Sequence, residues 1–264
     1  SKRFFDITFP DDSPRLIAVI GDPHLGVHTN WKLLRHHMKL LADNSGIVPG
    51  SEDNGVWAAN IGDTGNNWSY RLMSQYANED ISRETERRLA RWFMQDAGIR
   101  FCLWLHGNHE HMADEFLTYL ETINAQAVPM VDWRARVRFV FPSTAVKFDF
   151  AHNHRGTSIY SKTHGQKRAQ LFDPPCDVTV AGHHHLYSIT QEELDDGRNV
   201  VMCRVRGYKW LDTWAHRTGF AHMKMGSTIA FCINPKAKGP MKITPFPDSV
   251  SYTHLRAHET VLDL

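Results

Sequence analysis

The chain has little cysteine and no long hydrophobic run. Its 4 cysteines are scattered among 264 residues, so their spacing predicts neither a zinc knuckle nor a redox motif and favours buried free thiols. No apolar run approaches the roughly 18 residues that a membrane span needs, and residues 1–10 lack the apolar stretch of a secretory signal. The sequence therefore excludes the membrane class and predicts a soluble, cytoplasmic protein.

Neither sign of charge is in excess, because 30 basic residues stand against 29 acidic ones. The two signs are distributed unevenly: residues 1–132 carry 12 basic and 18 acidic side chains, whereas residues 133–264 carry 18 and 11. The basic second half suits either an anionic partner or an ordinary mixed surface. Histidine is abundant, with 17 copies. Because histidine combines metal ligation with proton transfer near neutral pH, this excess indicates a functional site.

Short apolar runs alternate with amphipathic stretches along much of the chain. Helices are predicted at 31–41 and 79–95, and the strands expected to precede polar loops are 16–20, 56–61, 100–105, 145–150 and 177–181. The later segments 187–193, 199–205 and 227–233 are predicted to be antiparallel strands. This alternation indicates a largely parallel sheet covered by helices, in which ligands gather beyond the carboxyl ends of the strands.

One domain is predicted, spanning residues 1–249. The length suits a single large α/β domain, and no linker or internal repeat divides the chain. The segment 250–260 resembles translated adapter sequence. Residues 250–264 are therefore expected to be a non-native tail without function.

Five polar clusters each follow a predicted strand. They are Asp22-Pro23-His24, Gly62-Asp63, Gly107-Asn108-His109-Glu110, Ala151-His152-Asn153-His154 and Gly182-His183-His184-His185. Residues two apart on an extended strand exit share a side, so Asp22 with His24, and His183 with His185, can converge on a metal centre. Glycines beside them let the backbone turn sharply.

In this order, the clusters resemble the motif series of calcineurin-like metallophosphoesterases over about residues 16–235. The resemblance implies an α/β fold, a four-layer αββα sandwich with mixed sheets. It also implies two divalent metal ions, the first held by Asp22, His24, Asp63 and His185, and the second by Asn108, His152, His183 and the shared Asp63. Mn²⁺ is favoured, with Fe, Zn²⁺, Co²⁺ or Ni²⁺ as alternatives, because mixed nitrogen and oxygen ligands suit all of them.

The implied reaction is in-line attack at phosphorus by a hydroxide that bridges the metals, with His109 protonating the leaving oxygen. Many family members have a carboxylate three residues after the bridging aspartate to orient this histidine. This chain has Asn66, which can orient an imidazole but cannot stabilise its cation as a carboxylate would. His109 and Asn66 are the predicted catalytic residues.

Three further runs resemble uncharacterised metallophosphoesterases of bacteriophages and prophages. They are Gly62-Asp63-Thr64-Gly65-Asn66-Asn67-Trp68, Thr163-His164-Gly165 and Arg206-Gly207-Tyr208-Lys209. This resemblance suggests a viral origin and the cytoplasm of a bacterial host, but it indicates no substrate.

His152 and His154 compete for one ligand position. We favour His152 because it follows the apolar strand directly, which leaves His154 to contact substrate or to pack in the loop. Further candidates for substrate contact come after predicted strands, although each suits a solvated surface equally well: Arg155, His164, Arg206 and Lys209.

Three arginines alternate along a predicted strand, so Arg134, Arg136 and Arg138 share one face. That face suits either a nucleic-acid backbone or an exposed sheet edge kept soluble by charge. The tryptophans lack the interleaved basic residues of a stacking platform, so most are predicted to lie in the core. They include Trp68, Trp92, Trp104, Trp133, Trp210 and Trp214.

Three functions remain open at this point. The run Asp22-Pro23-His24-Leu25-Gly26 is similar to that of DNA-repair exonucleases of the superfamily and favours a phosphodiesterase or nuclease acting on DNA or a nucleotide. A phosphomonoesterase acting on nucleotides or phosphoproteins would use the same metal centre. A non-catalytic metal-binding scaffold is disfavoured, because every ligand position carries a competent residue. The sequence does not decide the oligomeric state or the pathway.

Overall fold

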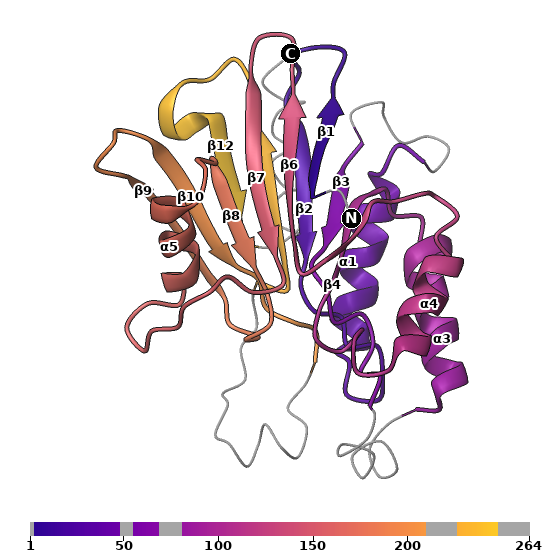
Figure 1. The fold of residues 1–264 in the computed structure, drawn as a ribbon. Helices are drawn as coiled ribbons and strands as arrows, with labels where there is room; N and C mark the ends of the chain where they lie inside the picture. The colour runs from indigo at the N-terminus through magenta and orange to yellow at the C-terminus, as the bar shows by residue number, and fades with distance from the viewer. Residues whose placement is uncertain (1–2, 48–54, 69–80, 210–225, 248–264) are drawn as a thin grey trace.

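Two six-stranded mixed sheets form the centre of the molecule in the computed structural model, which describes residues 3–47, 55–68, 81–209 and 226–247 (Figure 1). The first sheet has the order β12-β11-β2-β3-β4-β5. Its strands are β2 (Arg15–Ile20), β3 (Trp57–Asn60), β4 (Phe101–His106), β5 (Met130–Asp132), β11 (Thr228–Ile233) and β12 (Ile243–Phe246). Strands β2 to β5 are parallel, whereas β11 is antiparallel to both of its neighbours.

The second sheet has the order β1-β6-β7-β8-β10-β9. Its strands are β1 (Phe4–Thr8), β6 (Arg134–Val140), β7 (Ala145–Ala151), β8 (Val178–Ala181), β9 (Ser188–Glu193) and β10 (Asn199–Arg204). Strand β8 is parallel to both β7 and β10, and β9 pairs with β10 in the antiparallel hairpin expected from the sequence. The single largely parallel sheet predicted from the alternation is therefore wrong, because the parallel strands divide between two sheets.

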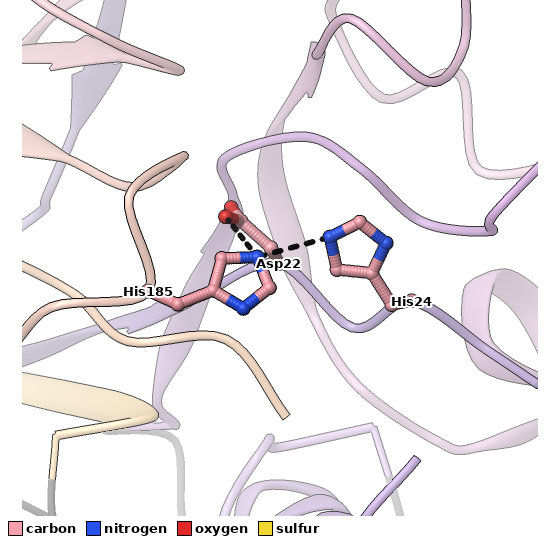
Figure 2. A group of neighbouring side chains, drawn as sticks. All are labelled: Asp22, His24 and His185. Atoms are coloured by element: carbon pink, nitrogen blue, oxygen red, sulfur yellow. Dashed lines mark hydrogen bonds and ion pairs between the residues drawn. The ribbon is translucent and has the colours of Figure 1, made fainter. Parts of the chain in front are cut away.

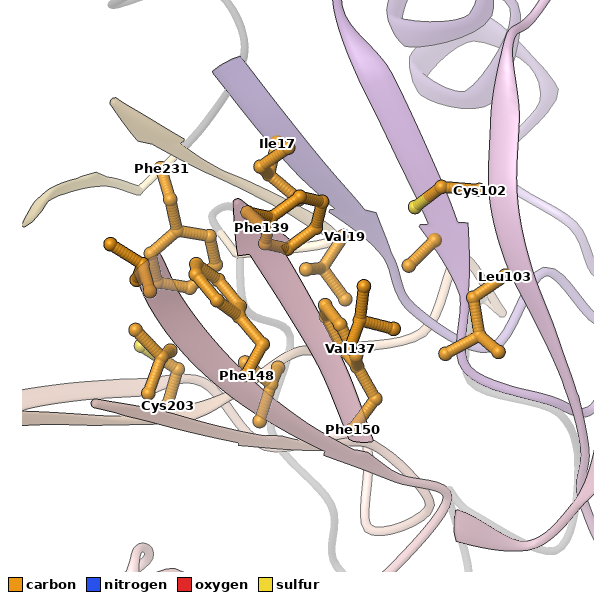
Figure 3. Packing of buried hydrophobic residues seen from close by; sticks show 14 of the residues in the cluster. Ile17, Val19, Cys102, Leu103, Val137, Phe139, Phe148, Phe150, Cys203 and Phe231 are labelled. Carbon is orange, nitrogen blue, oxygen red and sulfur yellow. The ribbon is translucent and has the colours of Figure 1, made fainter. Parts of the chain in front are cut away.

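The main hydrophobic core lies between the two sheets (Figure 3). Phe148 of β7 meets Phe231 of β11 edge to face, with ring centroids 5.3 Å apart. Burying a side chain of this size contributes about 1.5–3 kcal/mol. The four cysteines are free, three of them buried and Cys232 partly buried, as predicted. The packed interface holds the carboxyl ends of strands from both sheets in fixed positions.

Helices cover the outer face of each sheet. Four of the described elements cover the first sheet: α1 (Trp31–Asp43), α3 (Arg83–Arg91), the π-helical turn η2 (Trp92–Asp96) and α4 (Asp114–Thr122). On the second sheet, α5 (His164–Phe172) contacts β8 and β10, and Gln166 Nε2 donates to the carbonyl of Cys203 at 3.0 Å. The predicted four-layer αββα sandwich with mixed sheets is confirmed. No helix within the described ranges is long and apolar enough to cross a membrane.

Some element boundaries differ from the predictions. The predicted helix 79–95 is observed from Arg83, with Ser82 as its cap, and residues 79–80 lie outside the described residues. The expected tail 250–264 and the domain boundary at 249 also lie outside them. Two helices, α4 and α5, were not predicted. Each has only nine residues, and the starting signals that they carry were overlooked: the acidic first turn of α4 and Thr163 before α5.

The alternating arginines lie on β6, which pairs with β1 on one side and β7 on the other, so this strand is not a sheet edge. Arg134 and Arg136 donate to the fully buried carboxylate of Asp149, at 2.8 Å and 3.1 Å. Arg138 pairs with Asp6 on β1. Because each guanidinium already has a carboxylate partner, the face is a network of ion pairs within the protein.

Replacing Asp149 with asparagine should lower the free energy of unfolding by about 2–4 kcal/mol, because Arg134 and Arg136 lose a buried counter-charge. Burial acts to raise the pKa of Asp149, but hydrogen bonds from Arg134 and His154 hold it below its ordinary value. The carboxylate therefore contributes stability above that value of 3.8, and the contribution is lost as the pH falls below it.

Urea unfolding at pH 7 and at decreasing pH measures this effect, and the gap between wild type and Asp149→Asn should shrink in acid. Asp173→Asn is the matched control, because Asp173 also pairs with Arg134 but is 36% exposed. Its effect should stay below about 1 kcal/mol. Equal effects of the two substitutions would contradict the central position of Asp149.

Candidate metal centre

The five polar clusters meet at one end of the sandwich, beyond the carboxyl ends of strands from both sheets. Asp22, Asp63 and Asn108 follow β2, β3 and β4 of the first sheet, while His152 and His183 follow β7 and β8 of the second. Parallel strands bring such ends to the same edge. The structure thus places all five clusters where the strand pattern predicts.

Asp22, His24 and His185 form one group (Figure 2). His185 Nε2 lies 3.1 Å from His24 Nε2 and 3.5 Å from Asp22 Oδ2. Asp22 and His24 are almost fully buried, and His185 is partly buried. Three of the four ligands predicted for the first metal ion are therefore close together.

A second group contains Asp63, His152 and His183. His152 Nε2 lies 3.0 Å from Asn108 Oδ1, 3.1 Å from His183 Nδ1 and 3.4 Å from Asp63 Oδ2. Three of the four ligands predicted for the second ion thus surround the Nε2 atom of the fourth, His152.

Asp63 connects the two groups. Its Oδ2 atom lies 3.4 Å from His152 Nε2 in one group and 3.6 Å from His24 Nε2 in the other. Its second oxygen, Oδ1, accepts the backbone N–H of His109 at 2.9 Å. The carboxylate is therefore in position to serve both groups, as the resemblance implies.

The donor atoms fit divalent cations. Two atoms bound to one ion at about 2.1 Å, at octahedral or tetrahedral angles, lie about 3.0–3.4 Å apart, close to the separations observed. Asp22 Oδ1 is buried and has no hydrogen-bond partner among the described residues, which is costly unless a cation binds there. His152 Nδ1 donates to the carbonyl of Ile61 at 2.9 Å, which leaves Nε2 as the ligand atom.

Several of the candidate ligands lie on left-handed backbone and not on extended strand. The φ angles are 45° at His24, 51° at Asp63, 66° at His183 and 50° at His185. Each such residue costs of order 1–3 kcal/mol, and such strain gathers at functional sites. The expectation that His183 and His185 converge by sharing a side of an extended segment is therefore wrong. The turns direct them to different groups.

Close packing explains one of the glycines beside the ligands. A Cβ atom at Gly107 would lie 2.3 Å from Asp63 Oδ1 and 2.7 Å from His152 Cε1. No side chain fits in that space. Any larger residue at this position would displace the carboxylate that joins the two groups.

The electrostatics favour neutral imidazoles at His183 and His185 and a positive charge between the carboxylates. Burial lowers the pKa of His185 to about 3 and that of His183 to about 4, so both offer lone pairs at neutral pH. Burial raises the pKa of Asp22 to about 8, against the effect of His152. Burial acts to lower the pKa of His152, but Asp63 and Asp22 raise it to about 9. Cation binding would therefore keep Asp22 ionised and release a proton from His152.

Glu110 supports the centre from behind, a role the sequence reasoning missed. Its buried carboxylate accepts the backbone N–H groups of Asp63 at 3.0 Å, Thr64 at 2.7 Å and Gly107 at 2.7 Å. These bonds tie the loop after β3 to the loop after β4. The signal was its place directly after Asn108 and His109 in the third cluster.

His109 lies beside both groups. Its ring is perpendicular to that of His24, with centroids 4.7 Å apart, and its Nδ1 lies 2.5 Å from the backbone carbonyl of Asn66. Since a carbonyl only accepts, Nδ1 donates its N–H to it, and Nε2 is the nitrogen left for other contacts. The side chain of Asn66 has a different role, because its Oδ1 accepts from His24 Nδ1 at 3.1 Å. The prediction that the side chain of Asn66 orients His109 is therefore wrong, because the backbone carbonyl of Asn66 makes that contact.

Asn66→Ala should weaken metal binding about 10–100-fold, because His24 loses the partner that fixes its ligand tautomer. His109 keeps its bond to the backbone of residue 66. Titration of the metal-free protein with Mn²⁺ measures the affinity. Asn153→Ala serves as a control, since Asn153 also contacts a histidine, His184, at 3.4 Å. Unchanged affinity with reduced turnover would instead support an orienting role for the amide.

The predicted substrate residues are dispersed. His154 is 2% exposed, and its Nε2 lies 3.4 Å from Asp149 Oδ1, so it packs in the loop instead of facing the centre. Arg155 is exposed, and His164 is exposed at the start of α5. Arg206 is partly buried, and burial lowers its pKa. Of the two histidines that competed for the ligand position, only His152 lies in the cluster.

Several other described residues border the centre. Arg204 is buried and donates to the carbonyl of Gly182 at 2.7 Å. The ammonium of Lys209 lies 4.7 Å from the ring centroid of Trp68, which lies 5.2 Å from that of His109. Trp104 is buried in the core as predicted, but Trp68 and Trp133 are only partly covered. The structure does not describe Trp210 and Trp214.

No family model matches the sequence, and no curated protein matches it. The chain is similar in structure to vacuolar protein sorting 29 from Cryptosporidium parvum, with 10% identity and a TM-score of 0.44, over 89% of this chain and 99% of that chain. A single mutant of Vps29 from Entamoeba histolytica has 11% identity and a TM-score of 0.41, over 88% of this chain and 97% of that chain. A cold-active protein-tyrosine phosphatase of Shewanella sp. has 11% identity and a TM-score of 0.31, over 93% of this chain and 82% of that chain. These likenesses are weak, and the strand order itself defines the fold.

Proposed function

We propose that the protein is a metal-dependent phosphoester hydrolase with two divalent ions, and that phosphodiesters are its substrates. The observation that carries this proposal is the single carboxylate of Asp63, which lies within 3.6 Å of an imidazole nitrogen in each ligand group. Seven side chains would hold the ions: Asp22, His24 and His185 the first, Asn108, His152 and His183 the second, and Asp63 both. When bound, such a pair activates water and polarises phosphoryl oxygens for in-line displacement.

The chain's own residues supply the remaining chemistry. His109 is fixed by the carbonyl of Asn66 through Nδ1, so Nε2 is the atom that would give a proton to the leaving oxygen. Lys209 lies over Trp68 beside His109, where its positive charge would favour a phosphate anion.

A diester substrate is favoured by the run from Asp22 to Gly26, which resembles DNA-repair exonucleases, and by the basic second half of the chain. The runs that resemble phage metallophosphoesterases indicate no substrate by themselves, but the viral origin they suggest fits DNA processing in a bacterial cytoplasm. DNA or a nucleotide is therefore the proposed partner, and Mn²⁺ the proposed metal.

The test is a matrix of metals against substrates. Metal-free protein is loaded with Mn²⁺, Fe²⁺, Co²⁺, Ni²⁺ or Zn²⁺ and assayed on bis-p-nitrophenyl phosphate, p-nitrophenyl phosphate and single-stranded DNA. We expect metal-dependent cleavage of the diesters. Cleavage of the monoester alone would replace the proposal with a phosphomonoesterase acting on nucleotides or phosphoproteins. Two bound metal equivalents without any hydrolysis would indicate a non-catalytic scaffold.

A further inference from the structure

Trp133 is the single residue between β5 of the first sheet and β6 of the second. Its N–H donates to the carbonyl of His106 at 3.2 Å, and its own carbonyl accepts the N–H of His152 at 2.7 Å. The residue therefore connects the ends of β4 and β7 directly beside a metal ligand. Its backbone position is fixed from both sheets.

The conformation is unusual for such a side chain. Trp133 has a φ of 63°, in the left-handed region that glycine or asparagine adopts more easily than a bulky aromatic residue. Strained residues of this kind gather at active sites and ligand clamps. The crossing between sheets explains the backbone conformation but does not require an indole.

The indole is oriented and partly open to solvent. Its Nε1–H donates to the carbonyl of Asn153 at 2.9 Å. Trp133 is 36% exposed. Its ring centroid lies 5.1 Å from that of His152 and 6.2 Å from that of His183. A flat apolar surface is thus held next to the ligands proposed for the second ion.

The loop after β7, from Asn153 to Lys162, is basic and is held at both ends by Arg204. Arg204 donates to the carbonyl of Lys162 at 2.8 Å, and its guanidinium lies 3.4 Å from Asn153 Oδ1. Between Asp149 and Asp173 the sequence has no acidic residue, whereas Arg155 and Lys162 are exposed. Anionic groups of a substrate would meet favourable charge on this side of the centre.

We infer that Trp133 is a stacking subsite for a nucleobase of the substrate, with the loop from Asn153 to Lys162 as the adjoining contact for its phosphates. The inference rests on the proposed hydrolase and defines its substrate class as nucleic-acid strands or nucleotide diesters. Stacking on indole suits any base, because every base has a flat π-face. A rigid, partly exposed aromatic ring beside the reacting phosphate is the arrangement that such binding needs.

The first test compares two diesters with the same leaving group, thymidine 5′-(p-nitrophenyl phosphate) and methyl p-nitrophenyl phosphate, on the Mn²⁺-loaded protein. In Trp133→Leu, the ratio of kcat/KM for the thymidine substrate to that for the methyl substrate should fall about five- to hundredfold. Trp133→Phe should retain most of the ratio. Phe172→Leu is the matched control, because Phe172 is an aromatic residue 73% exposed at the end of α5. An unchanged ratio in Trp133→Leu overturns the inference.

A second test does not depend on turnover. The affinity of metal-free protein for fluorescently labelled oligo-dT, measured by anisotropy, should fall by a similar factor in Trp133→Leu and recover in Trp133→Phe. If wild type hydrolyses no substrate but Trp133→Leu loses affinity for oligo-dT, the hydrolase proposal is refuted and the stacking subsite is retained. If wild type hydrolyses diesters but Trp133→Leu keeps its affinity for oligo-dT, the stacking subsite is refuted and the hydrolase proposal is retained. Melting temperatures within a few degrees of wild type exclude a folding defect as the cause.

Discussion

Asp63→Asn should lower kcat/KM for bis-p-nitrophenyl phosphate by on the order of a thousandfold or more, about 4 kcal/mol of transition-state stabilisation. Asp63 Oδ2 is the only side-chain oxygen that the described residues place within 3.6 Å of imidazole nitrogens from both groups. An amide has one oxygen, carries no charge and presents N–H groups, so it cannot hold two cations together. Both proposed sites would be affected at once.

Metal content is the measurement that separates this effect from others. Elemental analysis after Mn²⁺ loading should give two equivalents for wild type and at most one for Asp63→Asn. Asp43→Asn is the control, because Asp43 forms an exposed ion pair with Lys39 at 2.7 Å on α1. It should match wild type in metal content and turnover. Two tightly bound equivalents and normal hydrolysis in Asp63→Asn would exclude a bridging carboxylate.

Strand ends were predictable because they carry local signals. Buried strands such as β2 and β4 are continuous apolar runs, and the polar residue that follows each run marks its carboxyl end. Their pairing into two sheets was not predictable from such runs, since it depends on contacts between distant segments. Strand β1 has an alternating exposed pattern and β12 contains Pro245, and both were missed.

The positions of the candidate ligands at the strand ends were more predictable than their backbone geometry. Asp22 and His24 converge as expected, but they do so through a left-handed residue that no spacing rule indicates. The choice of His152 over His154 followed the strand end, and the structure shows why the second histidine differs: Asp149 holds it. Backbone turns and buried partners of this kind arise only once the sheets are packed.

The prediction that most tryptophans lie in the core does not hold for Trp133. Trp104 is fully buried, whereas Trp133 is partly exposed because it lies at the crossing between the sheets. The sequence near Trp133 contains arginines at 134 and 136, yet both are used in ion pairs with Asp149. The basic residues of the proposed contact are instead Arg155 and Lys162, in the loop whose Asn153 carbonyl accepts from the indole of Trp133.

His109→Ala should lower kcat by about 10²–10⁴-fold while leaving two metal equivalents bound, because the imidazole lies beside the ligands without being assigned to either ion. The loss should depend on the leaving group. A p-nitrophenolate leaves readily without a proton, whereas the alkoxide released from a DNA strand needs one. The deficit should therefore be larger for DNA cleavage than for bis-p-nitrophenyl phosphate.

His111→Ala is the matched control for that experiment, because His111 is a nearby histidine whose ring pairs with Asp132 at 2.9 Å and is 41% exposed. It should leave both rates unchanged. Equal deficits of His109→Ala on the two substrates would refute proton donation to the leaving oxygen. Loss of a metal equivalent would instead make His109 a ligand, which its place in a group with His24 and Asp63 allows geometrically. The contact with the carbonyl of Asn66 favours the role of His109 as the general acid, since it holds Nδ1 and directs Nε2 away from that bond.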